Sequence, residues 1–249
     1  MEAFRPATAA VVVEWNPRDS GGMTCDVAFP EGRSTVMVSA TDRSGPASPG
    51  RAACPVVALV SSAGGLTATG TVLAGLPSEL DAAVIVLQHM APDHKSLLPE
   101  ILGRRTLLPV AAAYDGQPLV PGRVAVAPPG SHLLVSGDRR LALTPSGPYP
   151  PSRPSADLLL VTLALAAGPD AIAVVLSGKG NDSATGAAAV HRFGGTVVAT
   201  DAATSNHFDM PAACIVQDAT VDHVVPLDQV APLLVGLLRR PRLGAGTPG

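Results

Sequence analysis

Four short, largely apolar runs stand out along the chain: VVALV (56–60), AAVIVLQ (82–88), AIAVVL (171–176) and GTVVA (195–199). Stretches with a helical pattern lie between and beside them, near residues 68–76, 94–104, 155–167 and 183–193. Strands that are apolar on both sides are typical of a parallel sheet covered on both faces. The alternation therefore predicts an α/β fold, a doubly wound and mostly parallel sheet in a Rossmann-like, three-layer arrangement.

The middle of the chain has a different pattern. The short β-type pieces RVAVA, HLLV and RLALT are separated by PPGS and SGDR, which are turn sequences. We expect a local meander or antiparallel hairpin at an edge of the sheet. A last helix is predicted from Leu227 to about Arg240.

The first part of the chain is set apart by its composition. Residues 1 to about 41 contain three β-like pieces, AVVVEW, CDVAF and STVMVSA, and TDRSGPASPGR (41–51) has the composition of a linker. We therefore expect a short β appendage and linker over residues 1–50, a main domain over 51–240 and a flexible tail over 241–249.

Composition excludes several classes of protein. The 249 residues are 47% hydrophobic and 15% charged, with a formal net charge of -3, which argues against a disordered chain and against binding to nucleic acid or anionic membranes. Cys25, Cys54 and Cys214 are too few and too far apart for a disulfide framework or a structural zinc site. Without a signal peptide or an apolar run of about 20 residues, the chain is expected to be cytoplasmic.

Polar residues follow the predicted strands where parallel strands would end at one edge of the sheet. Ser62 follows the first strand, His89 the second, and Asp182 the strand at 171–176. A serine hydroxyl needs a base to become a nucleophile, and that base needs an acid to fix its tautomer. These three residues can fill those roles, and Gly64 and Gly65 allow a tight turn that aims backbone N–H groups at an oxyanion.

Simpler structural roles remain open at this point. Ser62 can be a turn or cap residue, His89 a histidine at the edge of the core, and Asp182 the N-cap of the helix that follows it.

Two ligand-binding alternatives remain as well. His89, Asp93 and His94 can be read as metal ligands, although Pro92 disfavours a helical presentation. The glycine pair can also cradle a phosphate, but SSAGGLTATG matches neither the Walker motif nor the dinucleotide fingerprint. No metal and no cofactor is expected.

At these residues the chain resembles the catalytic domain of the chemotaxis protein-glutamate methylesterases, the CheB family. That family has a GASTGG-like turn, a QHM-type motif and a loop of the type LTGMGxDG, and the corresponding segments here read VSSAGG, LQHMAP and LSGKGNDSATG. The stretches DGQPLVPGRVAVAPPGSHLLV, RPSADLL, FGGTVVATD and MPAACI are also similar. The resemblance runs in unbroken order over about residues 54–238.

The resemblance implies a reaction. Family members hydrolyse glutamyl methyl esters of chemoreceptors, and several also deamidate receptor glutamines. Ser62 would be the nucleophile, His89 the base and Asp182 the orienting acid. Ala63, Gly64, Gly65, Lys179 and Met210 would lie at the oxyanion or beside the substrate. The partner would be a methyl-accepting chemoreceptor helix or another methylated protein, docked across the site without insertion into the membrane.

Several residues depart from the family pattern. Ala63 stands where threonine is common, Lys179 replaces methionine, and Ser183 and Asp209 replace glycines. These changes leave two alternatives open: a diverged esterase with another substrate, and a catalytically weakened binding or signalling module. Residues 1–50 are also too short for the phosphoacceptor receiver domain common in the family, so a constitutively accessible hydrolase domain is expected.

Overall fold

The computed structural model describes residues 54–93, 95–147, 152–217 and 220–239, together with three earlier strands as backbone elements. These strands, β1 (Ala10–Glu14), β2 (Met23–Phe29) and β3 (Gly32–Val38), pair antiparallel in the order β1-β2-β3. They match the three β-like pieces predicted for the start of the chain. The linker predicted over 41–51 and the tail over 241–249 lie outside the described residues.

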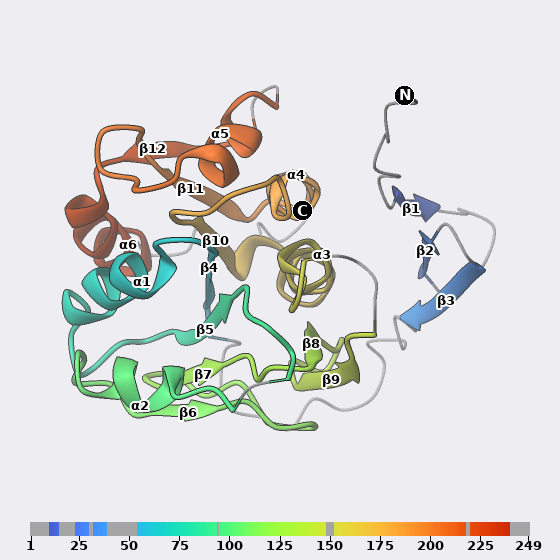
Figure 1. Ribbon diagram of the computed structural model, residues 1–249, viewed down its shortest axis with the longest axis horizontal. Helices are drawn as coiled ribbons and strands as arrows, with labels where there is room; N and C mark the ends of the chain where they lie inside the picture. Colours follow the sequence, from blue (N-terminus) through green and yellow to red (C-terminus); the bar gives the residue numbers. More distant parts are fainter. Residues whose placement is uncertain are drawn as a thin grey trace, which may run out of the picture.

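A seven-stranded parallel sheet forms the centre of the molecule, in the order β12-β11-β10-β4-β5-β7-β6 (Figure 1). All four strands predicted from the apolar runs are present, as β4, β5, β10 and β11. The strands of this sheet are β4 (Val56–Ser61), β5 (Ala83–Gln88), β6 (Val110–Ala112), β7 (Val124–Val126), β10 (Ala171–Val175), β11 (Thr196–Thr200) and β12 (His223–Val225).

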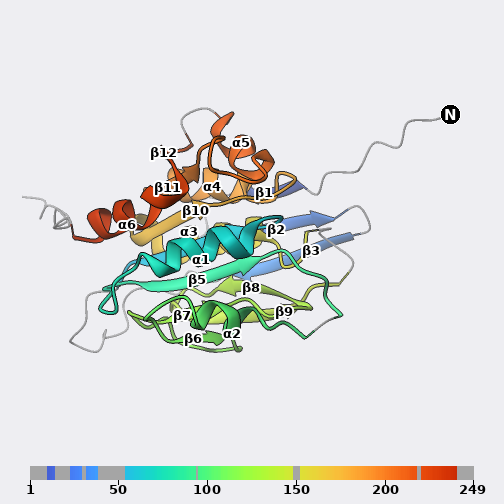
Figure 2. The ribbon, with the colours of Figure 1, turned by 60° about the vertical axis from the view of Figure 1, so that its left-hand side comes forward.

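Helices cover both faces of the sheet, which confirms the three-layer prediction (Figures 1 and 2). On one face lie α1 (Gly65–Ala74), α2 (Leu98–Gly103) and α6 (Val230–Arg239); on the other lie α3 (Ala156–Ala167), α4 (Ala184–Arg192) and α5 (Asp209–Ile215). Alternate residues of β4 pack against the two helix layers: Val57 and Leu59 pack with α1, whereas Val60 packs with α3. Two short 3-10 turns, Gly168–Asp170 and Leu227–Gln229, complete the fold.

The middle of the chain differs from the expectation in one respect. The predicted antiparallel hairpin is present as β8 (Ser131–Val135) and β9 (Leu141–Pro145), but it forms a separate two-stranded sheet beside α3. RVAVA is not part of that meander: it becomes β7, which pairs parallel with β5 and β6. Turn sequences on both sides of RVAVA suggested a local pairing, whereas its buried valines join the main sheet.

The register of the sheet brings the predicted site to one place. Strand β4 lies between β10 and β5, with Val60 opposite Val175 and Ser61 opposite Gln88. The loops that follow these three strands therefore leave the same edge side by side, as expected at the carboxyl ends of parallel strands. Within the described ranges, no helix has the length and apolar character to cross a bilayer.

Candidate active site

The turn after β4 presents Ser62 between the sheet and helix α1. Its backbone N–H donates to the carbonyl of Ser177, at 3.0 Å, and its carbonyl accepts from Gly65, at 2.9 Å. Gly64, the N-cap of α1, has φ +78°, a left-handed conformation that favours glycine. The turn thus fixes the backbone of Ser62 while leaving the residue partly exposed.

Ser177, two residues after the end of β10, holds this turn to the neighbouring loop. Its hydroxyl donates to the Ala63 carbonyl at 2.8 Å and accepts from the His207 N–H at 3.0 Å. A Cβ on Gly64 would lie 2.6 Å from the Ser177 oxygen. A glycine is therefore required at this position by space as well as by φ.

The three residues predicted at the oxyanion have different surroundings. The N–H groups of Ala63 and Gly64 donate to no acceptor among the described residues, and they lie at the N-terminus of α1, where the helix dipole favours negative charge. The N–H of Gly65 is already used by the Ser62 carbonyl. A glycine is required at position 65 for lack of space instead, because a Cβ there would collide with Ser61 Oγ.

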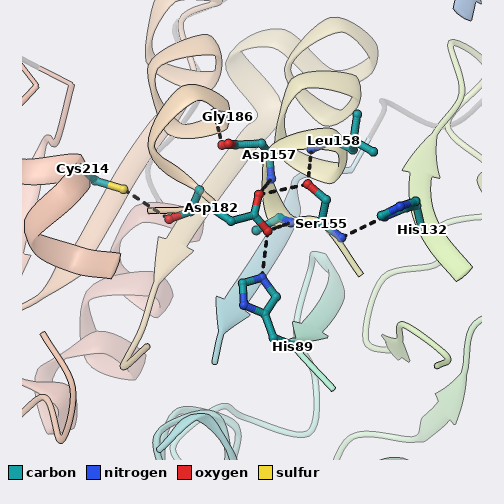
Figure 3. A network of polar contacts seen from close by, with 10 residues as sticks. His89, His132, Ser155, Asp157, Leu158, Asp182, Gly186 and Cys214 are labelled. Atoms are coloured by element: carbon teal, nitrogen blue, oxygen red, sulfur yellow. Dashed lines mark hydrogen bonds and ion pairs between the residues drawn. The ribbon is translucent and has the colours of Figure 1, made fainter. Parts of the chain in front are cut away.

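His89 and Asp182, which are 93 residues apart in the sequence, are in direct contact. His89 Nε2 lies 2.8 Å from Asp182 Oδ2, and the two side chains are 13% and 11% exposed (Figure 3). A carboxylate only accepts hydrogen bonds, so the imidazole donates from Nε2 and keeps the lone pair of Nδ1 for a proton. In this tautomer His89 can accept a proton at Nδ1.

Asp182 is held at the N-terminus of α3. Its Oδ1 accepts from Ser155 Oγ at 2.9 Å and from the N–H of Asp157 at 3.0 Å, and its Oδ2 accepts from the N–H of Ala156 at 2.7 Å as well as from His89. Both oxygens therefore have two donors each. The alternative that Asp182 caps the helix that follows it is wrong, because it caps α3 rather than α4.

A second carboxylate, that of Asp157, makes a contact in the opposite direction, from α3 to α4. Asp157, in the first turn of α3, accepts from the N–H of Gly186 in the first turn of α4 at 2.7 Å. Burial and the neighbouring Asp182 raise the pKa of Asp157 from 3.8 to about 7, against an opposing effect of the backbone N–H groups of α4. The two helices thus exchange caps, which fixes the loop that carries Asp182.

Ser62 lies close to this pair without being bonded to it. The His89 N–H donates to the Ser61 carbonyl at 3.0 Å, so Ser62 and His89 leave neighbouring strands directly after a paired position. Adjacent strands are about 4.8 Å apart. In the described part of the chain, Ser62 Oγ donates no hydrogen bond to His89, which is common for catalytic serines in free enzymes.

The remaining predicted neighbours lie around the turn. Lys179 is exposed on the loop that carries Asp182. Met210 is fully buried, and its N–H donates to the Gly178 carbonyl at 3.0 Å. A Cβ on Gly178 would collide with Met210 Sδ and lie 2.9 Å from Ser62 Cβ, so Met210 packs directly behind the Ser62 turn.

Two departures from the family pattern lie away from the reacting groups. Ser183 is buried, with φ 151°, and its hydroxyl lies 3.5 Å from Cys214 Sγ. Asp209 is exposed in the first turn of α5, where a negative charge favours the helix. Neither side chain contacts His89 or Ser62 among the described residues.

Four residues of the site were not predicted: His132, Ser155, Asp157 and Ser177. RPSADLL contains a signal for Ser155, a serine just before a helix, and the structure confirms it as the N-cap of α3. The other roles depend on contacts between distant segments. Of the residues considered as metal ligands, His94 lies outside the described ranges.

The fold and the site define a class of protein: an α/β domain that presents a serine, a histidine and an aspartate at adjoining strand ends. Comparison with known proteins gives the family. The family model for the CheB methylesterase matches residues 57–234, and the chain belongs to this family.

Named relatives are similar over the same part of the chain. Protein-glutamate methylesterase/protein-glutamine glutaminase 1 of Myxococcus xanthus is 41% identical over 190 residues, 75% of this chain and 55% of the relative. The enzyme of that type from Moorella thermoacetica is 37% identical over 188 residues, 74% of this chain and 44% of the relative. The chain thus spans about half the length of these relatives.

A solved structure agrees. The crystal structure of the Thermotoga maritima CheB methylesterase catalytic domain has a TM-score of 0.70 and 32% sequence identity, and the match covers 75% of this chain and 100% of that domain. The similarity therefore extends over one complete catalytic domain.

Proposed function

We propose that this protein is a serine hydrolase that demethylates glutamyl methyl esters of chemoreceptors, with residues 51–240 as its catalytic domain. The observation that carries the proposal is the 2.8 Å contact between His89 and Asp182 beside the strand end that presents Ser62. The names of the relatives supply the substrate class.

The first half of the reaction forms an acyl-enzyme. Ser62 Oγ attacks the ester carbonyl while its proton passes to His89 Nδ1, the nitrogen that Asp182 leaves free. The negative charge that develops on the carbonyl oxygen is stabilised by the N–H groups of Ala63 and Gly64 at the N-terminus of α1. His89 then returns the proton to the methoxide, and methanol leaves.

The second half regenerates the enzyme. Water attacks the glutamyl–Ser62 ester, His89 takes a proton from that water, and the same proton returns to Ser62 as the glutamate is released. A glutamine side chain can enter the same sequence with ammonia as the leaving group. Deamidation is therefore a second expected activity, in agreement with the glutaminase in the names of the relatives.

The surroundings of the site suit a protein substrate. Lys179, Asn181 and Asn206 are exposed around the partly exposed Ser62 and His89. An open rim of this kind allows a receptor helix to lie across the strand ends, and methanol needs no deep pocket. We place the enzyme in the cytoplasm, where the free thiols of Cys54 and Cys214 fit a reducing environment.

Methanol release from methylated chemoreceptor fragments tests the proposal. Ser62→Ala should abolish release, while the matched variant Ser61→Ala, which removes the buried neighbouring hydroxyl, should retain it. Equal release by the wild type and Ser62→Ala would refute the nucleophile. If the wild type releases no methanol although it binds the fragments, the chain is the binding module that Ala63 and Lys179 suggest.

A further inference from the structure

His132 is a buried histidine that the proposed reaction does not use. It lies on β8 and is 3% exposed. Its Nδ1 accepts the backbone N–H of Ser155 at 3.0 Å, and its Nε2 lies 3.1 Å from the Ser146 carbonyl. The ring therefore bridges the hairpin and the N-terminus of α3 (Figure 3).

These two contacts fix the tautomer of the ring. A backbone N–H can only donate, so His132 Nδ1 carries a lone pair, and a carbonyl can only accept, so His132 Nε2 carries the proton. The ring thus has one orientation, and a flipped ring would lose both contacts.

Ser155 connects this ring to the carboxylate of the site. Its hydroxyl accepts the Leu158 N–H at 3.4 Å as the N-cap of α3, and it donates to Asp182 Oδ1 at 2.9 Å. Ser155 is 1% exposed. The position of its backbone thus sets where the hydroxyl meets Asp182.

The hairpin touches α3 at a second point that does not involve Asp182. The Val135 N–H, at the end of β8, donates to Thr162 Oγ1 at 3.1 Å. This bond joins the same two elements farther along the helix, so it provides a matched control for the role of His132.

From this geometry we infer that His132 is a positioning residue for the catalytic cluster: acting through Ser155, it holds Asp182, and with it His89, in the productive orientation. The expected loss of kcat rests on the proposed function, whereas the expected effect on the positions of Asp182 and His89 does not. It also gives the β8–β9 hairpin a role as a brace for the site.

The test compares His132→Asn, His132→Gln and Thr162→Val with the wild type. An asparagine places an acceptor near the position of Nδ1 and can receive the Ser155 N–H, whereas a glutamine places its polar group near Nε2 and cannot. Three quantities are measured: kcat and KM for methyl ester hydrolysis, the solvent exchange rate of the His89 Nε2 proton by NMR, and the thermal unfolding midpoint.

We expect His132→Gln to lower kcat by roughly 10²-fold with little change in KM, because misplaced catalytic groups cost about this much. Exchange of the His89 proton should become faster in the same variant. His132→Asn should recover most of kcat and slow exchange, and Thr162→Val should match the wild type in both.

Two results would overturn the inference. One is equal activity of His132→Gln and His132→Asn. Because glutamine fills the space of histidine better but cannot accept the Ser155 N–H, equal activity would show that the hydrogen bond is not what matters. The other is a loss of kcat in Thr162→Val equal to that in His132→Gln, since a general weakening of the hairpin would then suffice. If the wild type hydrolyses no ester but His89 exchange still follows this order, the proposed function fails while the positioning role stands.

Discussion

The side chains of Asp182 and Ser62, at the two ends of the site, are held in different ways. Both oxygens of Asp182 have two donors each, three of the four from the N-cap and the first two residues of α3, so the carboxylate has one orientation. Ser62 is held only through its backbone and through Ser177, and its hydroxyl bonds to no described residue. Hydrogen bonds are thus concentrated on the proposed acid, Asp182, while the hydroxyl of the proposed nucleophile, Ser62, has no bonded partner among the described residues.

This difference predicts that Ser62→Ala separates activity from stability most completely. The variant should lose on the order of 10⁴-fold or more in kcat, because the covalent route is gone. Its thermal unfolding midpoint should stay at the wild-type value, since no side-chain hydrogen bond is lost. A clear drop in that midpoint would contradict the account of the nucleophile end.

Asp182→Ala should damage both properties. Loss of the acid should lower kcat by about 10⁴-fold, and the donors of Ser155, Ala156 and Asp157 left without their acceptor should lower the free energy of unfolding by about 2 kcal/mol. Urea unfolding measures the second effect. Asp138→Ala, which removes an exposed carboxylate paired with Arg140, is the control and should cost less than about 1 kcal/mol.

A pair of glycine variants sharpens the comparison at the nucleophile end. Gly64 and Gly116 have φ +78° and +74°, but a Cβ on Gly64 would meet Ser177 Oγ at 2.6 Å, while a Cβ on Gly116 would meet nothing within 4 Å. Gly116→Ala should cost only the backbone strain, about 1 to 2 kcal/mol. Gly64→Ala should cost more and also reduce ester turnover; equal effects would show that the contact with Ser177 does not shape the turn.

A further prediction concerns the second cap, made by Asp157. Because the pKa of Asp157 rises from 3.8 to about 7 on folding, the folded protein binds a proton in this range that the unfolded chain lacks. The contribution of Asp157 to stability therefore falls as the pH rises from about 4 to 7. Asp157→Asn keeps an acceptor for Gly186 and removes this titration, so the variant should gain stability relative to the wild type over that range. Parallel curves from urea unfolding would contradict the shift.

The sequence predicted the fold where burial was strong on both faces of a strand. β4, β5, β10 and β11 are almost wholly buried, and their apolar runs are unambiguous. β6 and β12 are three-residue edge strands with exposed positions, so they leave no comparable pattern. β7 is buried but only three residues long and lies between turn sequences, which led to the placement of RVAVA in a meander.

At the site, the sequence predicted which residues gather but not what holds them. Ser62, His89 and Asp182 could be predicted because each lies in the segment that follows a strand of one parallel sheet. The roles of His132 and Asp157 depend on how the hairpin, α3 and α4 approach each other. No spacing in the sequence contains that information.

In the proposed reaction Ser62, His89 and Asp182 work as one unit. Labelling with a fluorophosphonate, followed by mass spectrometry of the modified peptide, tests it most directly. We predict stoichiometric labelling of Ser62 in the wild type and strongly slowed labelling in His89→Gln and Asp182→Ala. Labelling at another serine, or equal rates in all three proteins, would contradict the account.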